Sequence, residues 1–275
     1  MPHPWCGCRV QAILPRMTGE SSSDHERRTG EAPVSFGYRK VSAADKPSMV
    51  QSVFRSVATR YDIMNDVMSA GTHRLWKAAL VDWLAPRPGL RVLDVAGGTG
   101  DIAFRIHARC PDSDVLVCDL TEEMLTVGRD RAVDRGILRG LDWLCADAEA
   151  LPLRDRSVEA YTVSFGLRNV THLEQALAEA YRVLKPGGRF LCLEFSQVAL
   201  PLLRDAYDLY SFRIIPRLGE AIARDRESYQ YLVESIRRFP DQDGLAQRMA
   251  AAGLARVQYR NLMGGVAALH SGWRL

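Results

Sequence analysis

The stretch "RVLDVAGGTGDIAFRI", residues 91–106, constrains the folds open to this chain more than any other. Its first residues are mostly apolar, glycines dominate residues 97–100, and apolar residues resume at the spacing of one helix face with Ile102, Ala103 and Ile106. This pattern predicts a buried strand, a tight turn and an amphipathic helix. A glycine-rich turn between a strand and a helix lets a ligand approach the backbone closely, so we expect a binding site here.

The same order of strand and helix repeats along the rest of the chain. Short apolar segments that we expect to form strands lie at residues 114–120, 141–152, 158–169 and 189–196. The helical pattern before the last of them begins with a capping box, Thr171-x-x-Glu174, and stops at residues 186–188. Alternation of this kind predicts a doubly wound α/β fold with a mainly parallel sheet, in which ligands bind at the carboxyl ends of the strands.

Segments outside this alternation complete the expected fold. Two entry helices precede the glycine turn, at residues 49–58 and 72–84, and the second should bury Leu75, Ala78, Ala79 and Trp83. Segments 255–262 and 266–275 alternate apolar with polar residues, so they should form two closing strands, one of them antiparallel to the rest. We therefore expect a seven-stranded, Rossmann-like sheet with N-terminal entry helices and a helical insertion, residues 199–222, before the last two strands.

Composition limits the classes of function. The chain has 275 residues, of which 47% are hydrophobic and 25% charged, enough for the core of one domain. The net charge is only +3 and basic residues are interleaved with acids, so we expect no nucleic-acid partner. No run approaches the roughly 18 apolar residues of a membrane-spanning helix, so any membrane contact should be peripheral. The six cysteines form no disulfide framework, which favours a reducing compartment.

The N-terminal residues have a different character from the rest. Residues 1–35 are rich in Ser, Gly and charged side chains, so we expect a disordered extension followed by one domain at residues 36–275. Residues 1–16 contain arginine and no acid, which indicates either a mitochondrial transit peptide or a start upstream of the true one at Met17. The tract Cys6-Gly7-Cys8 lacks a second ligand pair, and we expect no metal site.

Two cofactors compete for the glycine turn. Gly98 and Gly100, with Asp119 about twenty residues further on, satisfy the dinucleotide fingerprint of a nicotinamide-dependent oxidoreductase. Asp94, just before the turn, would repel a pyrophosphate but suits the ammonium of an amino acid. With Asp119 on the ribose hydroxyls and Asp147 on an adenine amine, the three acids match S-adenosylmethionine, which carries no phosphate. The alternative is that the turn is merely tight and the acids are solvated strand ends.

Six segments give the chain a resemblance to one family. They are "RYDIMNDVMSAGTHRLWK" (60–77), "LDVAGGTGDIA" (93–103), "SFGLRNVTH" (164–172), "RVLKPGGRFLCLEFS" (182–196), "YQYLVESIRRFP" (229–240) and the ending "LHSGWRL". From about Phe36 to the C-terminus, the sequence resembles the ubiquinone/menaquinone biosynthesis C-methyltransferases, class I S-adenosylmethionine-dependent enzymes. The combination of "FGLRNV" and "MNDVMS" with the glycine turn is far more specific than the turn alone.

The resemblance implies roles for individual residues. The family's cofactor contacts fall on Thr99, Asp119, Asp147, Ala148 and Ser164. Arg168 matches the arginine to which the family assigns substrate activation, and because a guanidinium stays protonated, it should stabilise a phenolate or orient a water. Asn169 and Tyr61 should hydrogen-bond around the methyl group and the ring hydroxyl. As alternatives, Asn169 caps a helix, Tyr61 is a packing ring, and His172 or His73 is the base.

The function that the resemblance implies is C-methylation of a methoxy-substituted polyprenyl-benzoquinol in ubiquinone synthesis, with demethylmenaquinol as a second substrate. A ring carbon becomes nucleophilic when the neighbouring hydroxyl ionises, so the reaction requires no metal. The remaining alternative is a scaffold of a quinone-synthesis complex without catalysis.

The same resemblance suggests where the chain works and with what. Residues 199–222 are aromatic and aliphatic between arginines, and two interpretations stay open: a roof over a tunnel for the prenyl chain at a membrane surface, or packing against the sheet or a dimer partner. We expect a peripheral protein of the bacterial inner membrane, on its cytoplasmic side, or of the matrix side of the mitochondrial inner membrane. Its partners should be the polyprenylated quinol and either a second copy or a quinone-synthesis complex.

Overall fold

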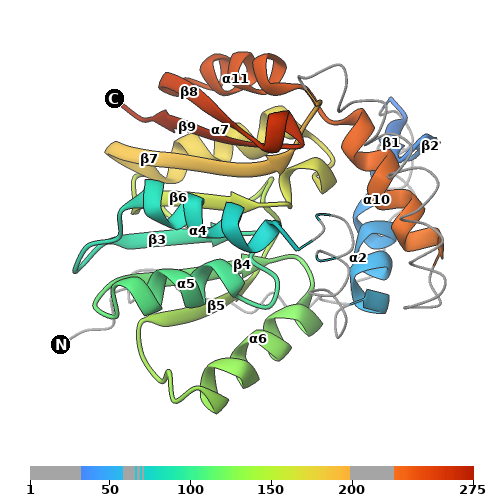
Figure 1. Cartoon of the computed structure of the whole chain (residues 1–275). Helices are drawn as coiled ribbons and strands as arrows, with labels where there is room; N and C mark the ends of the chain where they lie inside the picture. Colours follow the sequence, from blue (N-terminus) through green and yellow to red (C-terminus); the bar gives the residue numbers. More distant parts are fainter. Residues whose placement is uncertain (1–31, 58–65, 67–68, 70, 199–225) are drawn as a thin grey trace, which may run out of the picture.

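The computed structural model describes residues 32–57, 66, 69, 71–198 and 226–275, and a seven-stranded sheet forms its centre (Figure 1). The strands are ordered β5-β4-β3-β6-β7-β9-β8. Their bounds are β3 Arg91–Val95, β4 Asp114–Asp119, β5 Leu141–Cys145, β6 Val158–Ser164, β7 Leu184–Phe195, β8 Ala255–Leu262 and β9 Ala267–Trp273. Strands β3 to β7 are parallel, and β9 is antiparallel to both its neighbours, β7 and β8. The predicted mainly parallel seven-stranded sheet is confirmed.

Helices cover both faces of this sheet (Figure 1). One face carries α4 (His73–Leu84) and α5 (Asp101–Arg109), the other carries α7 (Leu173–Val183) and α11 (Gln242–Ala251), and α6 (Glu122–Asp134) packs on β4 and β5. Successive side chains of a strand point to opposite faces, so Val92 enters one core and Leu93 the other. Burial on both faces explains why the parallel strands are nearly continuous apolar runs.

The remaining elements gather near the carboxyl ends of the parallel strands, at the right of Figure 1. They are α2 (Lys46–Val57), α10 (Arg226–Arg238) and a hairpin of β1 (Val34–Phe36) and β2 (Arg39–Val41). Phe36 of the hairpin stacks on Tyr231 of α10, with ring centroids 4.2 Å apart. Two cavities lie between these elements and the ends of the strands.

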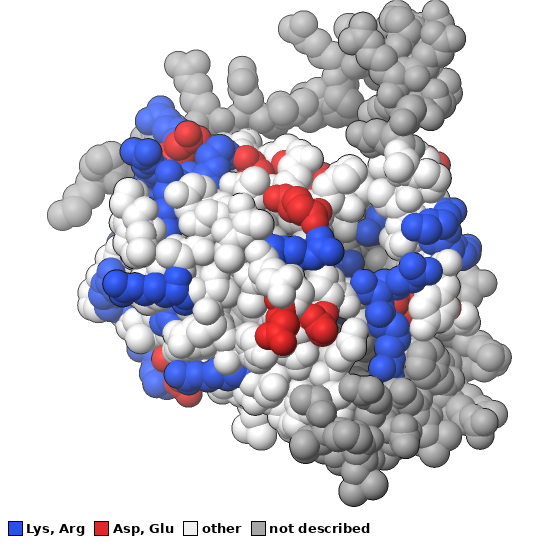
Figure 2. Space-filling model, turned by 90° about the horizontal axis from the view of Figure 1, so that it is seen from above, with Lys and Arg blue, Asp and Glu red and all other residues white. Residues whose placement is uncertain are grey.

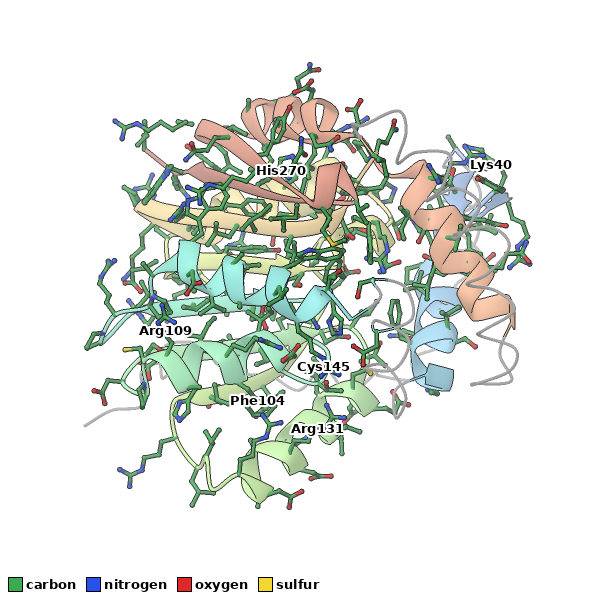
Figure 3. The ribbon with its side chains drawn as sticks, viewed as in Figure 1. Lys40, Phe104, Arg109, Arg131, Cys145 and His270 are labelled. Atoms are coloured by element: carbon green, nitrogen blue, oxygen red, sulfur yellow. The ribbon has the colours of Figure 1, made fainter. Side chains whose placement is uncertain are left out.

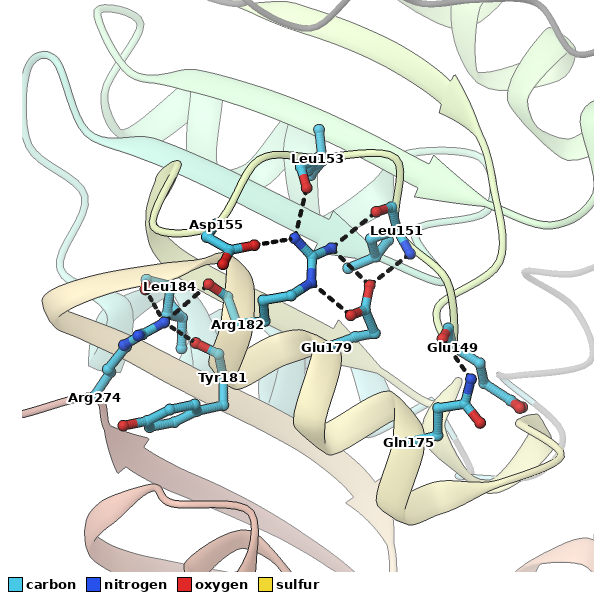
Figure 4. Close-up of polar contacts among 10 residues, drawn as sticks. All are labelled: Glu149, Leu151, Leu153, Asp155, Gln175, Glu179, Tyr181, Arg182, Leu184 and Arg274. Atoms are coloured by element: carbon cyan, nitrogen blue, oxygen red, sulfur yellow. Dashed lines mark hydrogen bonds and ion pairs between the residues drawn. The ribbon is translucent and has the colours of Figure 1, made fainter.

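Two arginines fasten neighbouring segments to α7 (Figure 4). Arg182 donates to two carboxylates and two carbonyl groups, those of Glu179, Asp155, Leu151 and Leu153. Arg274, just after β9, donates to the carbonyl groups of Tyr181, Arg182 and Leu184. A guanidinium with this many acceptors has little freedom to move. The connection between β5 and β6, which contains Asp147, is therefore held firmly against α7.

The prediction of the buried face of α4 is wrong for Leu75 and Ala78, whereas Trp83 packs against the core as predicted. Leu75 is 72% exposed, and Ala78 is also exposed. The helix packs on the sheet through Trp76, Leu80, Val81 and Leu84 instead. Apolar residues occur all round this helix, so its hydrophobic pattern fits more than one face.

The predicted capping box of α7 is also wrong. The carboxylate of Glu149, from the connection after β5, accepts hydrogen bonds from the N–H groups of Thr171 and His172. Glu174 pairs with Arg248 of α11 instead of reaching back to the backbone. The helix ends at Val183, shortly before residues 186–188 as predicted, and these residues already belong to the long strand β7.

Several predicted features fall outside the described residues. They are residues 1–31 of the expected extension, Tyr61 and the insertion at residues 199–222. The hairpin begins at Val34, slightly before the expected domain boundary. In the part of the chain that the structure describes, every helix is too short or too polar to cross a membrane.

Candidate active site

The glycine-rich turn after β3 lies against β4 and α6. The N–H of Gly98 donates to Asp119 Oδ2 at 2.9 Å, which ties the turn to the end of β4. Gly100 has a φ of +82°, and a Cβ there would lie 2.7 Å from the ring of Trp143. A Cβ on Gly97 would meet a side chain of β4 at 2.6 Å. Glycine is therefore required both for the backbone conformation and for the close packing of this cradle.

Asp94 is the buried acid beneath the cradle. Its Oδ1 accepts a hydrogen bond from Thr162 Oγ1 at 2.7 Å, and its Oδ2 is buried with no hydrogen-bond partner among the described residues. Burial raises the pKa of Asp94 to about 7, although the bond from Thr162 acts in the opposite direction. Lys77 is close enough to affect this carboxyl but is ion-paired with Asp101 at 2.8 Å. An unsatisfied buried oxygen of this kind suits a cationic donor brought by a ligand.

Two further acids follow the next strands of the sheet. Asp119 Oδ1 accepts a hydrogen bond from the N–H of Thr121 at 2.8 Å, and Asp147 Oδ1 accepts one from the N–H of Glu149 at 2.9 Å. Burial raises the pKa of both carboxyls, and these backbone bonds oppose the shift. Each carboxylate oxygen has two lone pairs, so both acids can still accept hydroxyl or amine donors.

A mostly apolar cavity lies over these strand ends, between α2 and α6. Predicted site residues in its wall are Gly98, Asp119, Asp147, Ala148 and Asn169. The same wall contains Ala96 and Phe165, two non-glycine residues with φ of +50° and +57°. Backbone strain of this type costs about 1–3 kcal/mol per residue and is concentrated at functional sites. The mixture of apolar wall and a few placed acids is typical of a pocket for a small organic cofactor.

The other predicted site residues lie beside this cavity rather than in its wall. Within the described part of the chain they are Asp94, Thr99, Gly100, Ser164 and Arg168. The hydroxyl of Thr99 accepts a hydrogen bond from Arg131 of α6, which Figure 3 labels. Ser164 Oγ is buried without a hydrogen-bond partner among the described residues. Tyr61 is not among the described residues.

Arg168 lies on a short turn, η2 (Leu167–Asn169), that follows β6. Its side chain is buried, and Nη1 donates to Glu194 Oε1 at 2.7 Å and to the carbonyl of Phe165. Burial raises the pKa of Glu194, and the charge of Arg168 opposes this shift. The Nε of Arg168 is buried and has no hydrogen-bond partner among the described residues.

Asn169, the next residue of η2, lies between two elements. Its side chain lines the cavity over the strand ends, and its Oδ1 accepts a hydrogen bond from the hydroxyl of Tyr231 at 3.1 Å. Asn169 does not cap α7, because the N-cap of that helix is His172. Arg168 instead lines a second cavity, so the two residues of η2 belong to different walls.

The sequence-based prediction missed three residues that hold this turn. Glu194 binds Arg168, Tyr231 binds Asn169, and Glu149 binds the backbone directly after η2. The sequence contained one signal, an acid in the otherwise apolar strand "FLCLEF" that ends at residue 195. The other two contacts join segments far apart in the sequence, and no local pattern indicates them.

The two histidines considered as bases are both engaged with carboxylates. His172 Nδ1 lies 2.8 Å from Glu149 Oε2, and His73 Nε2 lies 2.8 Å from Asp66 Oδ1. Burial lowers the pKa of His73, and the partner carboxylate opposes the shift. Among the described residues, no group of three His, Cys, Asp or Glu side chains could hold a metal ion.

Comparison with solved structures identifies the fold. A SAM-dependent methyltransferase from Aquifex aeolicus superimposes with a TM-score of 0.54 at 15% identity, covering 72% of this chain and 89% of that one. Phosphoethanolamine N-methyltransferase 2 of Haemonchus contortus, in complex with S-adenosyl-L-methionine, gives a TM-score of 0.55 at 14% identity. The superposition covers 72% of this chain and 52% of that one. At this identity the similarity shows the fold alone.

Comparison of sequences identifies the family. A model of the ubiE/COQ5 methyltransferase family matches residues 39–274. The Dinoroseobacter shibae protein named ubiquinone/menaquinone biosynthesis C-methyltransferase UbiE is 60% identical to this chain over 240 residues. The match covers 87% of this chain and 96% of the relative. The protein of that name from Brucella abortus is 56% identical over 257 residues, which cover 92% of this chain and 96% of the relative. These matches support neither an oxidoreductase nor a scaffold, and they confirm the resemblance: the chain belongs to the ubiE/COQ5 methyltransferase family.

Proposed function

We propose that this chain transfers a methyl group from S-adenosylmethionine to a ring carbon of a polyprenyl-benzoquinol, and that demethylmenaquinol is a second substrate. Relatives at 56–60% identity carry the name of this activity. The observation that carries the proposal is the set of three acids around the glycine cradle: Asp94, Asp119 and Asp147. Two of these acids line the cavity and Asp94 lies beneath the cradle, while no Lys or Arg is found among the described residues of the cavity wall; this arrangement suits a cofactor with an ammonium, two ribose hydroxyls and an amine.

The residues present fit that cofactor. The buried Oδ2 of Asp94, which no described residue contacts by a hydrogen bond, would accept the ammonium. The remaining lone pairs of Asp119 would accept the ribose hydroxyls. Asp147 and the backbone of Ala148 would recognise the adenine edge. Thr99, Gly98 and Gly100 would contribute backbone groups of the cradle. The hydroxyl of Ser164, which has no hydrogen-bond partner in the described part of the chain, would lie beside it.

S-adenosylmethionine supplies an electrophilic methyl group when bound. The protein must then favour the ionised form of the quinol hydroxyl next to the carbon that is methylated. We assign this role to Arg168, because a guanidinium keeps its charge and the Nε–H of Arg168 has no hydrogen-bond partner among the described residues. Asn169 and Tyr61 would orient the ring hydroxyl and the methyl group, and no metal is needed for this role.

Two positioning residues follow from the contacts of η2. Glu194 fixes the direction of the Arg168 guanidinium from β7, and it also accepts the Arg168 N–H at 3.3 Å. Tyr231 fixes Asn169 from α10. A buried, charged arginine without a carboxylate partner would strongly destabilise the folded protein. Glu194 therefore allows Arg168 to be both charged and buried.

We also propose that the chain works peripherally at the cytoplasmic face of a bacterial inner membrane, where a polyprenylated quinol is dissolved. The relatives from Dinoroseobacter shibae and Brucella abortus are bacterial, which supports this compartment over the mitochondrial matrix. A homodimer or a quinone-synthesis complex remains our proposal for its assembly.

The function is tested with purified protein, methyl-labelled S-adenosylmethionine and a short-chain quinol. We expect one label per quinol on a ring carbon, identified by mass spectrometry. Labelled product that carries the methyl group on oxygen, or a folded protein that binds NADH and not S-adenosylmethionine, would overturn the proposal.

The role of Arg168 is tested by Arg168→Lys. Lysine keeps the charge beside Glu194, so cofactor affinity should stay near normal, whereas single-turnover methylation should fall about 10²- to 10³-fold. Raising the pH should partly restore the rate, because the quinol then ionises without help. Arg139→Lys, on an exposed loop, is the matched control. Near-normal turnover in Arg168→Lys would remove this residue from the mechanism.

A further inference from the structure

A second cavity, of about 320 Å³, lies on the other side of η2 from the cofactor cavity. The hairpin, α10 and the start of α7 contribute to its wall, which is mostly polar. Among the described residues, the charged side chains that line it are all cationic: Lys40, Lys46, Arg168, Arg238 and Arg248. Figure 2 shows several groups of Lys and Arg on this face, one of them at the right, on the side where Figure 1 places the hairpin and α10; Figure 3 labels Lys40 on that side.

Two of these cations are neutralised by acids from outside the cavity. Glu194 pairs with Arg168, and Glu174 pairs with Arg248. The other three form no ion pair with the described residues. Each contacts an uncharged group instead: Lys40 contacts the hydroxyl of Ser35, Lys46 the carbonyl of Val170, and Arg238 the ring of Tyr38. The cavity therefore holds an excess of positive charge.

This excess is not confined to a solvated surface. Lys46 is only 6% exposed, and its ammonium, which can donate three hydrogen bonds, donates one to the carbonyl of Val170 at 2.7 Å. Glu149 also attracts this ammonium, but its carboxylate accepts bonds from the backbone at the start of α7. Buried cations with unused donors are costly unless an anion accepts from them.

The lining indicates which anion would fit. Hydroxyl groups of Ser35, Thr171 and Ser235 stand among the cations, so a ligand with several acceptor oxygens would find both charge and hydrogen bonds. A phosphate group has the charge and the acceptors that this wall lacks.

We propose that this cavity binds a phosphate group, carried by free phosphate or by the headgroup of an acidic phospholipid. The site is separate from the cofactor cavity, although Val170 and Thr171 line both. A bound phosphate would contact the back of the turn that presents Asn169 to the cofactor cavity. The proposal does not rest on methyl transfer, so its test uses neither cofactor nor quinol.

The test compares two double variants of the full chain that lose the same charge. Lys40→Gln/Arg238→Gln removes two exposed cations of the cavity, and Arg139→Gln/Arg154→Gln removes two exposed arginines elsewhere. Binding of inorganic phosphate is measured by calorimetry at low salt. We expect the first variant to bind at least about tenfold more weakly than the second, because each charge-assisted bond contributes appreciably. The second should bind like the unaltered chain.

A parallel arm identifies the source of the phosphate. Both variants are sedimented with neutral phosphatidylcholine vesicles and with vesicles that contain phosphatidic acid. A loss confined to the phosphatidic acid vesicles and to Lys40→Gln/Arg238→Gln indicates a lipid headgroup, and a loss of inorganic phosphate binding alone indicates a soluble ligand. Equal binding by the two variants in both arms, or no binding of either probe by the unaltered chain, would overturn the proposal. Neither result would affect the methyltransferase assignment.

Discussion

Replacement of Asp94 by asparagine should make the protein more stable at neutral pH and less able to bind its cofactor. The carboxyl has a pKa of about 7 against an ordinary value of 3.8. One pKa unit corresponds to about 1.4 kcal/mol, so the ionised carboxylate costs the folded state about 4 kcal/mol. Asparagine can still accept from Thr162, but it buries an unpaired amide at a cost of about 1–3 kcal/mol. We therefore expect a net gain of about 1–3 kcal/mol above pH 7.

The sign of the pH dependence distinguishes this explanation from simple repacking. A carboxyl whose pKa is raised in the folded state stabilises the fold below its unfolded pKa, and that contribution is lost as the pH rises from about 4 to about 7. The advantage of Asp94→Asn should therefore grow over this range and then level off. Urea denaturation at several pH values measures it, with Asp130→Asn on the exposed surface of α6 as the control. An advantage that is independent of pH would refute the reasoning.

Cofactor binding should change in the opposite direction. The ammonium of S-adenosylmethionine would lose a charged acceptor, which is worth about 1.5–3 kcal/mol, so calorimetry should show roughly 10- to 150-fold weaker binding. In the unaltered chain, affinity should increase as the pH rises towards 7, because Asp94 must ionise to accept the ammonium. Unchanged affinity in Asp94→Asn would place this acid outside the site.

Three further changes test neighbouring contacts. Asp119→Ala should abolish measurable cofactor binding and also lower the free energy of unfolding by about 1–3 kcal/mol, since two backbone N–H groups lose their acceptor; calorimetry and urea denaturation separate the effects. Tyr231→Phe keeps the stacking on Phe36 but frees Asn169, so kcat should fall up to about tenfold with KM and cofactor affinity unchanged; an unaltered kcat would contradict this positioning role. Gly100→Ala should lower the free energy of unfolding by at least about 1–2 kcal/mol, because an L-residue is unfavourable at a φ of +82°; thermal denaturation measures it.

The sheet was predictable because parallel strands carry strong local signals. Strands β3, β4 and β6 are short apolar runs, each followed by a helix pattern, and right-handed crossovers leave few ways to order such units. The acids at strand ends were predictable for the same reason: a side chain at the carboxyl end of one parallel strand lies near those of its neighbours. Asp119 and Asp147 line the cavity as this argument requires, whereas Asp94 is buried deeper than expected.

What the sequence could not indicate are contacts that depend on which strands and helices become neighbours. Glu194 meets Arg168 only because β7 pairs with β6. Glu149 takes over the capping of α7 because the connection after β5 passes close to the start of that helix. The sequence also could not indicate which way the Arg168 side chain points. Arg168 and Asn169 face different cavities because they lie on a short helical turn, not on a strand with alternating side chains.

The order of the strands has a consequence for how this molecule opens. β8 is hydrogen-bonded to the sheet only through β9, so it cannot remain docked as a strand once β9 has detached. Opening from this edge would release β8 first and β9 next, and it would leave β3, β4 and β6 paired. Those three strands lead into the loops that contain the glycine cradle, Asp119 and η2. Amide hydrogens of β8 should therefore exchange with solvent long before those of β3, while the protein still holds its ligand.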